Sequence, residues 1–321
     1  MEQPLPIHRS TPTREAGRSG SAMRRRTARP GPDQLVRVGP NAFVRALDWN
    51  AAGPRTRYVT RVHARLLRLG APASASHASA AALHGLAWLA GWPEDVHVTV
   101  PRSRYRSRSP GLVLHTRPLG ASGVARDGRV TATTVERTVI DVALTGDVRS
   151  AVVLADSALR RGVSAAQLDH ALAAYPAARG RRTAELVLEL ADARSGSPAE
   201  SFARVVFREL GLPEPVLQQE FVLDGRRIVV DFWFPEQGVV VEIDGRAKYT
   251  QERYLAGRSP ADAFIDEKRR QELLLTSPDV RRVVRVEWRD LHLPEPLAHR
   301  LRAAGLPCAV RPGPSAILAA A

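Results

Sequence analysis

The sequence predicts two domains of mixed α and β structure: an α+β region comes first, and an α/β domain with a central mixed sheet flanked by helices follows. The chain has 321 residues, which is enough for two domains with substantial cores. Short apolar runs rich in β-branched residues, such as IVVDFWF and VVVEID, alternate with segments of helical periodicity. Turn residues separate these segments, so we expect both helices and strands in each domain.

The composition limits the class of protein. Cys308 is the single cysteine, which excludes a disulfide framework and a zinc site built on several cysteines. No apolar run reaches the length of a membrane span, and the N-terminus lacks the apolar core of a signal peptide. We therefore expect a cytoplasmic protein that does not contact a membrane.

The net charge of +14 lies entirely in residues 1–196. Residues 197–321 carry 18 basic and 18 acidic residues, so 29 of the 47 basic and 15 of the 33 acidic residues belong to the first part. A basic half joined to a neutral half suggests that the first half binds the phosphates of DNA. An Arg-rich surface that only keeps the protein soluble is the alternative.

The second half contains a predicted hairpin, in the stretch from residue 220 to residue 249. Turn residues separate three strand-like runs there. If the second turn, PEQG, is a four-residue loop, Phe234 pairs with Val239. The apolar residues on both sides of this turn are typical of a buried strand pair. We therefore expect this hairpin to lie at the centre of the second domain.

Three acids interrupt the apolar hairpin: Asp231, Glu242 and Asp244. Counting from the turn places Asp231 opposite Glu242, which shares a strand face with Asp244 because side chains alternate. Opposed like charges destabilise a sheet by about 0.2–1 kcal/mol, and a bound divalent cation would remove this repulsion. We predict a metal site here; a solvent-facing side that tolerates acids is the alternative.

These acids and their surroundings resemble the PD-(D/E)XK nuclease superfamily, and more closely its branch related to very-short-patch-repair endonucleases. The resemblance covers about residues 197–291, in SPAESFARVVFRELGLP, VDFWFPE, VVVEIDG, DEKRRQELL and VVRVEWRDL. It implies a restriction-endonuclease-like fold and metal-dependent hydrolysis of phosphodiester bonds in DNA. Asp231, Glu242 and the carbonyl of Ile243 would then hold Mg²⁺ (or Mn²⁺), and Asp244 would belong to the catalytic group.

The resemblance also makes Glu200 the carboxylate that a helix contributes to the site. The spacing of Ser197 and Glu200 is that of a capping box, so Glu200 also has a structural role at a helix start. These two roles are compatible. The same spacing predicts helix starts at Thr133 with Glu136 and at Ser164 with Gln167.

The catalytic cation is not assigned by the pattern. Where the superfamily has a Lys, two residues after the second acid, this chain and the related branch differ, and Asp244 stands here. The chain has only two lysines, Lys248 and Lys268. We favour Lys268, four residues after Phe264 on a predicted helix, because a helix fixes position better than a loop. Lys248 and Arg269 are expected to contact DNA; an exposed cation is the alternative for Lys268.

The first half has a resemblance of its own. The segments LVRVGPNAF, SHASAAALHGL, VHVTVP, VTATTVERTVIDVAL and ADSALRRGV are similar to AbiEi-type antitoxin or transcriptional-regulator proteins, up to about residue 190. Residues 34–47 match only the wing of that family's winged helix-turn-helix, so a partial winged-helix-like element is expected. The resemblance implies association with DNA and a cognate toxin or defence-system partner.

The predicted organisation is a disordered basic arm (1–33), an α+β DNA-associated domain (34–192), an endonuclease-like domain (197–306) and a flexible tail (307–321). The basic loop RSRYRSR adds Arg102, Arg104 and Arg106 as candidate DNA contacts, because arginines beside an aromatic ring suit contacts to phosphates and bases. A solvated loop is the alternative.

Two further patterns have plain structural interpretations. Residues 148–177 contain two predicted helices around Gly162, which we interpret as a helical pair rather than a DNA-binding helix-turn-helix. His77 and His84 share a face of another predicted helix. A gap of seven residues is wide for a pair of metal ligands, so we interpret both as packing or capping residues.

The sequence therefore supports two main hypotheses of function. One is a metal-dependent DNA endonuclease with a basic DNA-associating domain. The other is a DNA-binding transcriptional regulator or antitoxin that carries a catalytically idle nuclease fold. A nucleic-acid-binding scaffold without turnover is a third.

Overall fold

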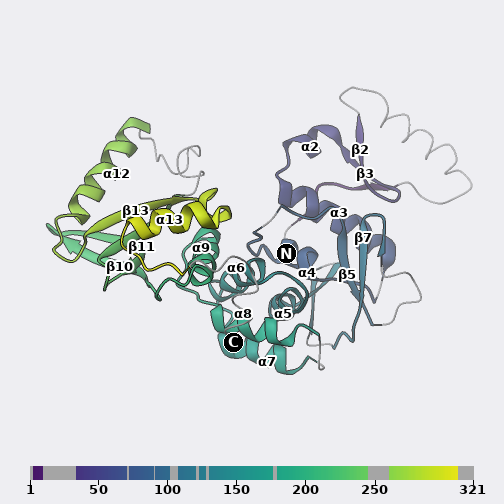
Figure 1. Cartoon of the computed structure of the whole chain (residues 1–321). Coiled ribbons are helices and arrows are strands. Elements are labelled where there is room, and N and C mark those ends of the chain that lie inside the picture. Colours follow the sequence, from purple (N-terminus) through teal and green to yellow (C-terminus); the bar gives the residue numbers. More distant parts are fainter. Residues whose placement is uncertain are drawn as a thin grey trace, which may run out of the picture. The chain divides into compact units, whose positions relative to one another are not determined.

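The computed structural model describes residues 3–9, 34–70, 72–89, 91–101, 108–120, 123–127, 130–175, 179–244 and 260–309 (Figure 1). The chain folds as two units, Met1–Asp147 with Arg161–Ala184 and Val148–Arg160 with Glu185–Ala321, and each is described by itself. Several predicted features lie outside the described residues: most of the basic arm (10–33), Arg102, Arg104, Arg106, Lys248, the side chain of Phe264 and the tail from residue 310.

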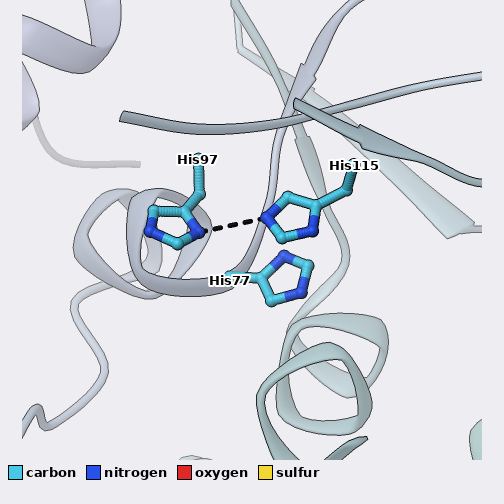
Figure 2. A group of neighbouring side chains, drawn as sticks. All are labelled: His77, His97 and His115. Carbon is cyan, nitrogen blue, oxygen red and sulfur yellow. Dashed lines mark hydrogen bonds between the residues drawn. The ribbon is translucent and has the colours of Figure 1, made fainter. Parts of the chain in front are cut away.

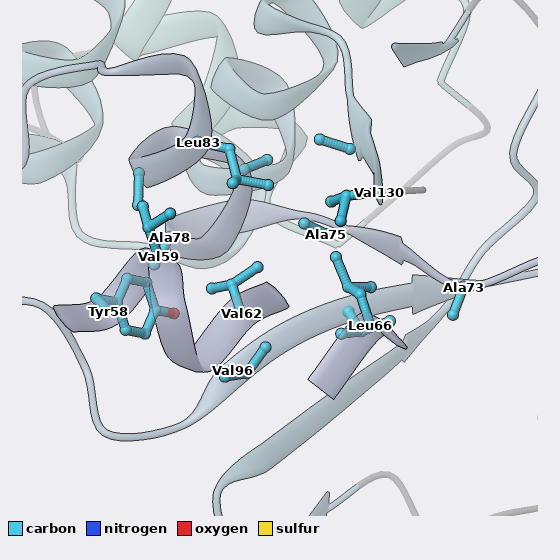
Figure 3. Packing of buried hydrophobic residues seen from close by; sticks show 14 of the residues in the cluster. Tyr58, Val59, Val62, Leu66, Ala73, Ala75, Ala78, Leu83, Val96 and Val130 are labelled. Carbon is cyan, nitrogen blue, oxygen red and sulfur yellow. The ribbon is translucent and has the colours of Figure 1, made fainter. Parts of the chain in front are cut away.

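The first unit is built on a six-stranded mixed sheet with the order β6-β7-β5-β4-β9-β8. Its strands are β4 (Ser74–Ala75), β5 (Val96–Val100), β6 (Arg108–Ser109), β7 (Leu112–Thr116), β8 (Val124–Asp127) and β9 (Val130–Thr133). The helices α3 (Pro54–Leu69) and α4 (His77–His84) pack apolar residues against this sheet. Figure 3 shows Tyr58, Val62 and Leu83 in the resulting core.

A smaller sheet of the first unit has the order β1-β3-β2 and consists of β1 (His8–Arg9), β2 (Leu35–Gly39) and β3 (Ala42–Arg45). The prediction of disorder was wrong for residues 3–9. The backbone N–H of Leu5 donates to Thr60 Oγ1 at 3.0 Å, and Leu5 and Ile7 pack against the buried cluster that includes Val44. These apolar residues gain a partner only in the tertiary fold, which local composition does not reveal.

The other helices in the described part of the first unit are α2 (Ala46–Ala51), α5 (Val135–Thr145) and α7 (Ala165–Ala173), and the boundary between the units falls inside α8 (Arg181–Leu190). The predicted capping box of Ser164 and Gln167 is confirmed. The predicted helix start at Thr133 was wrong by one residue: Thr134 is the N-cap of α5, and Thr133 ends β9.

The second unit has a four-stranded sheet with the order β10-β11-β12-β13. Its strands are β10 (Val216–Leu223), β11 (Arg226–Phe234), β12 (Val239–Asp244) and β13 (Arg282–Glu287). The first three are antiparallel neighbours, and β13 is parallel to β12. Phe207 of α9 (Pro198–Glu209) packs against Phe232, while Leu274 of α12 (Pro260–Leu274) belongs to a separate cluster with Val230 and Val240. Helices therefore flank a central mixed sheet.

The unit boundary differs from the predicted one because α6 (Val148–Leu159) groups with the second unit. Asp156 of α6 is fully buried and lies 2.8 Å from Arg204 of α9, and Arg149 at the start of α6 pairs with Glu209. Such charges are buried only when they are paired, so they tie α6 to α9. The two helices that flank Gly162 therefore belong to different units.

The predicted coarse fold class agrees with the structure: both units mix helices and strands, and both larger sheets are mixed. The short η2 (Asp290–His292) and α13 (Pro294–Ala303) complete the described part of the second unit. Every helix in the described ranges is too short or too polar to span a bilayer.

Candidate active site of the second unit

The predicted hairpin register is confirmed at its turn, where Phe234 pairs with Val239. The regular pairs continue to Phe232 with Val241. The next residue of β11 is Asp231, and it lies where the alternation of side chains is interrupted. Val230 and Trp233, three residues apart, belong to one core cluster, although strand residues three apart normally point to opposite faces.

This interruption aims the carboxylate of Asp231 at the neighbouring strand. Asp231 Oδ2 accepts a hydrogen bond from the backbone N–H of Ile243 at 2.8 Å. Ile243 stands between Glu242 and Asp244, so the Asp231 carboxylate is held beside the Glu-Ile-Asp segment that the sequence singled out. Opposite Asp231 on β10, Gln218 has φ +52°, a second irregularity at the same level of the sheet.

Glu242 is buried, and its charge is neutralised by an arginine that the sequence reasoning missed. Arg270 Nη1 of α12 lies 2.6 Å from Glu242 Oε1. Arg270 Nη2 also donates to the carbonyl of Val229 at 2.7 Å, so both terminal nitrogens of the guanidinium contact the sheet. The signal in the sequence was the helical spacing, because Arg270 precedes the buried Leu274 by four residues.

Asp244 has a different partner, since its Oδ2 lies 3.8 Å from Arg285 Nη1 of the parallel strand β13. The three acids therefore do not crowd together as the register alone suggested. In the described part of the chain, their oxygens do not form a group of three within 4.8 Å of one another. Asp231 accepts from a backbone N–H, Glu242 pairs with Arg270, and Asp244 lies near Arg285.

At the start of α9 the N-cap contact predicted for Ser197 and Glu200 forms, while the Glu200 side chain turns to Gly196 and Gln218. Ser197 Oγ accepts from the backbone N–H of Glu200 at 3.2 Å, as an N-cap does. The Glu200 side chain accepts from the N–H of Gly196 at 2.7 Å and from Gln218 Nε2 at 2.8 Å. Gln218 is the β10 residue opposite Asp231, so the helix carboxylate and the hairpin acids meet the sheet at the same level. No sequence signal pointed to Gln218.

Lys268 does not reach the carboxylates in the structure. Its side chain is 70% exposed, and its Nζ lies 3.8 Å from Glu272 Oε1 of the same helix. Arg269 is also exposed. The cation that α12 places at the acids is that of Arg270.

The donor atoms at this site fit Mg²⁺ or Mn²⁺ chemically. Carboxylate and carbonyl oxygens are the hard ligands that these ions take, and Asp231, Glu242 and Ile243 supply them on adjacent strands. A cation that binds Glu242 must compete with the guanidinium of Arg270 for this carboxylate. Metal binding would therefore release Arg270 from its ion pair.

The chain matches no family model and no solved structure. It is similar to two proteins of Mycobacterium tuberculosis that are named only as uncharacterized, MT2308 of strain CDC 1551 / Oshkosh and Rv2248 of strain ATCC 25618 / H37Rv. Each is 33% identical over 151 residues, which cover 46% of this chain and 55% of the relative. The chain thus spans about half the length of the curated relatives it matches.

Proposed function

We propose that the second unit hydrolyses phosphodiester bonds in DNA with a divalent metal ion, and that the basic first unit binds the DNA. The observation that carries the proposal is the hydrogen bond from Ile243 N–H to Asp231, which fixes one carboxylate beside Glu242 and Asp244. A metal ion bound there would supply the Lewis acid that polarises the scissile phosphate.

The residues of the chain have separate parts in this proposal. Asp231 and Glu242 bind the cation, and the carbonyl of Ile243 completes the donor set on β12. Glu200 orients water at the edge of the site, where Gly196 and Gln218 hold its carboxylate in place. Asp244, beside Arg285, keeps the local charge negative and favours a cation.

Arg270 takes the role that the sequence analysis gave to Lys268. Its guanidinium pairs with Glu242 when the metal is absent, and it contacts a phosphate oxygen when the metal takes its place at Glu242. A planar guanidinium binds a phosphate through two parallel hydrogen bonds, which suits the stabilisation of developing charge. Because Arg270 also donates to Val229, it is already positioned at the sheet.

A regulator with an idle nuclease fold is the second candidate. It is favoured by Asp244 at the position where the superfamily pattern has a Lys and by the exposure of Lys268. Nicking of a supercoiled plasmid in Mg²⁺ or Mn²⁺ separates the two candidates, because an idle fold gives none. A reporter fused to the promoter of this protein's own gene separates a regulator from a scaffold, because only a regulator changes its expression.

A further inference from the structure

A second cluster of titratable side chains lies in the first unit and includes none of the residues used above. His77 is the first residue of α4, His97 lies on β5 and His115 lies on β7. One ring nitrogen of each lies within 4.8 Å of those of the other two. Among the described residues, no other group of three or more His, Cys, Asp or Glu residues has this geometry. Figure 2 shows the three rings gathered at one place.

The sheet brings two of these histidines together. β5 and β7 are parallel, and their register pairs His97 with Val113 and Thr99 with His115. His97, Thr99 and His115 therefore point to the same face of the sheet, opposite to the core residues of these strands. The Thr99 hydroxyl is buried and has no hydrogen-bond partner among the described residues, so this face contains polar groups that the fold does not satisfy.

His77 contacts the histidines of these strands from an unfavourable backbone conformation. Its φ is +50°, a region that costs a non-glycine residue about 1–3 kcal/mol, and its side chain is 7% exposed. His77 Nδ1 lies 3.0 Å from Ser76 Oγ. When Nδ1 donates to this hydroxyl, Nε2 keeps its lone pair, which is how metal-bound imidazoles are commonly oriented.

The spacing of the ring nitrogens is that of metal ligands. His97 Nδ1 and His115 Nε2 face each other at 3.1 Å. Two imidazole nitrogens bound to one tetrahedral Zn²⁺, with Zn–N bonds of about 2.0–2.1 Å, are about 3.3 Å apart. A metal ion can therefore replace the proton that the two rings now share with almost no movement of either strand.

One buried acid and two arginines act on the charge of the cluster. Burial lowers the pKa of His77 and of His115, because it removes the hydration of the imidazolium. Asp141 of α5 is buried, and its negative charge acts on His115 in favour of a positive charge, whereas Arg117 and Arg137 act against one. Asp141 Oδ2 has no hydrogen-bond partner in the described part of the chain.

We propose that His77, His97 and His115 form a binding site for a divalent transition metal ion of the Zn²⁺ type. Three imidazoles leave one position of a tetrahedral ion for water or another ligand. The rings of His77 and His115 are stacked, with their centroids 3.7 Å apart. A metal lies in the plane of each imidazole that binds it, so the ring of His77 has to turn when the ion binds.

The test is isothermal titration calorimetry of Zn²⁺ into the untagged full-length protein after treatment with a chelator. We expect a saturable site whose affinity falls at least about tenfold in His97→Asn and in His115→Asn. The control His170→Asn removes an exposed histidine of α7 and should keep the affinity of the wild type. Absence of saturable binding by the wild type overturns the proposal. Wild-type affinity in both His97→Asn and His115→Asn overturns it as well.

X-ray absorption at the zinc edge of the loaded wild-type protein does not depend on whether the variants fold. We expect first-shell nitrogen ligands with the multiple scattering of about three imidazoles. A first shell of oxygen ligands without imidazole scattering overturns the proposal, because it places the ion at carboxylates instead.

Discussion

Arg270 Nη1 lies 2.6 Å from Glu242 Oε1, so a helix and a strand of the second unit meet through an ion pair at the candidate site. The carboxylate is 9% and the guanidinium 30% exposed, so water compensates little for the loss of either partner. This pair explains how a buried glutamate is tolerated beside two other acids when no metal is bound.

Removal of the guanidinium should therefore destabilise the metal-free protein. We expect Arg270→Gln to lower the free energy of unfolding by about 1–3 kcal/mol, the loss for a hydrogen bond to a buried charge. Urea unfolding with and without Mn²⁺ measures this effect, and Mn²⁺ should reduce the deficit because it neutralises Glu242. Arg269→Gln, at the exposed neighbouring position, is the control and should change stability by less than about 0.5 kcal/mol. Equal stability of the two variants would contradict the role of the pair.

The hairpin acids should make the melting temperature sensitive to metal. A ligand that binds only the folded state stabilises it, so Mg²⁺ or Mn²⁺ should raise the melting temperature of the wild-type protein. Asp231→Asn should abolish this response, while the amide oxygen still accepts from Ile243 N–H and preserves the fold. Asp224→Asn, in an exposed turn, should respond like the wild type. A wild-type melting curve that is indifferent to both metals would contradict the site.

Much of this hairpin could be predicted from the sequence. The turn residues and the β-branched runs determine the pairing of Phe234 with Val239, because a hairpin is a local structure. The irregularity at Asp231 could not be predicted, since the residues around it, IVVDFWF, are those of a regular strand and include no glycine or proline. Lys268 and Arg270 differ by two positions on one helix, and only the tertiary fold shows which one faces Glu242.

The histidine cluster was not predictable from local patterns. His97 and His115 are 18 residues apart and come together only through the parallel pairing of β5 with β7. The sequence places His77 and His84 on one helix face, and both were interpreted as packing or capping residues. In the structure His84 Nε2 lies 2.6 Å from the carbonyl of Thr133. The available signal in the sequence was one histidine in each of the apolar runs VHVTV and LVLHT.

The two cations of α12 should differ in the chemical step. We expect Arg270→Gln to slow single-turnover cleavage at saturating enzyme by about 10²–10³-fold, as removal of one transition-state donor does. Lys268→Gln should leave this rate nearly unchanged, because its side chain is 70% exposed and pairs with Glu272. If Lys268→Gln slows cleavage and Arg270→Gln does not, Lys268 is the catalytic cation.

The basic loop of the first unit should contribute to DNA affinity through phosphates. Replacing Arg102, Arg104 and Arg106 together by Ser should weaken duplex binding for all sequences. Each phosphate contact contributes about 0.9 to the slope of log affinity against log salt, so the slope should become shallower by about 2–3. Fluorescence anisotropy over a range of salt concentrations measures this change. A matched triple replacement of exposed arginines in the neutral half, Arg226, Arg281 and Arg302, should have a much smaller effect. If both triple variants lose the same affinity, the assignment of DNA binding to the basic half is wrong.

The most direct test of the proposed function is nicking of supercoiled plasmid DNA by the full-length protein in Mn²⁺, with Asp231→Asn and Asp224→Asn assayed beside it at the same concentration. The account predicts nicking by the wild type and by Asp224→Asn, none after chelation of the metal, and a loss of at least about 10²-fold for Asp231→Asn. Nicking by Asp231→Asn at the wild-type rate, or no nicking by the folded wild-type protein in either Mg²⁺ or Mn²⁺, would contradict it.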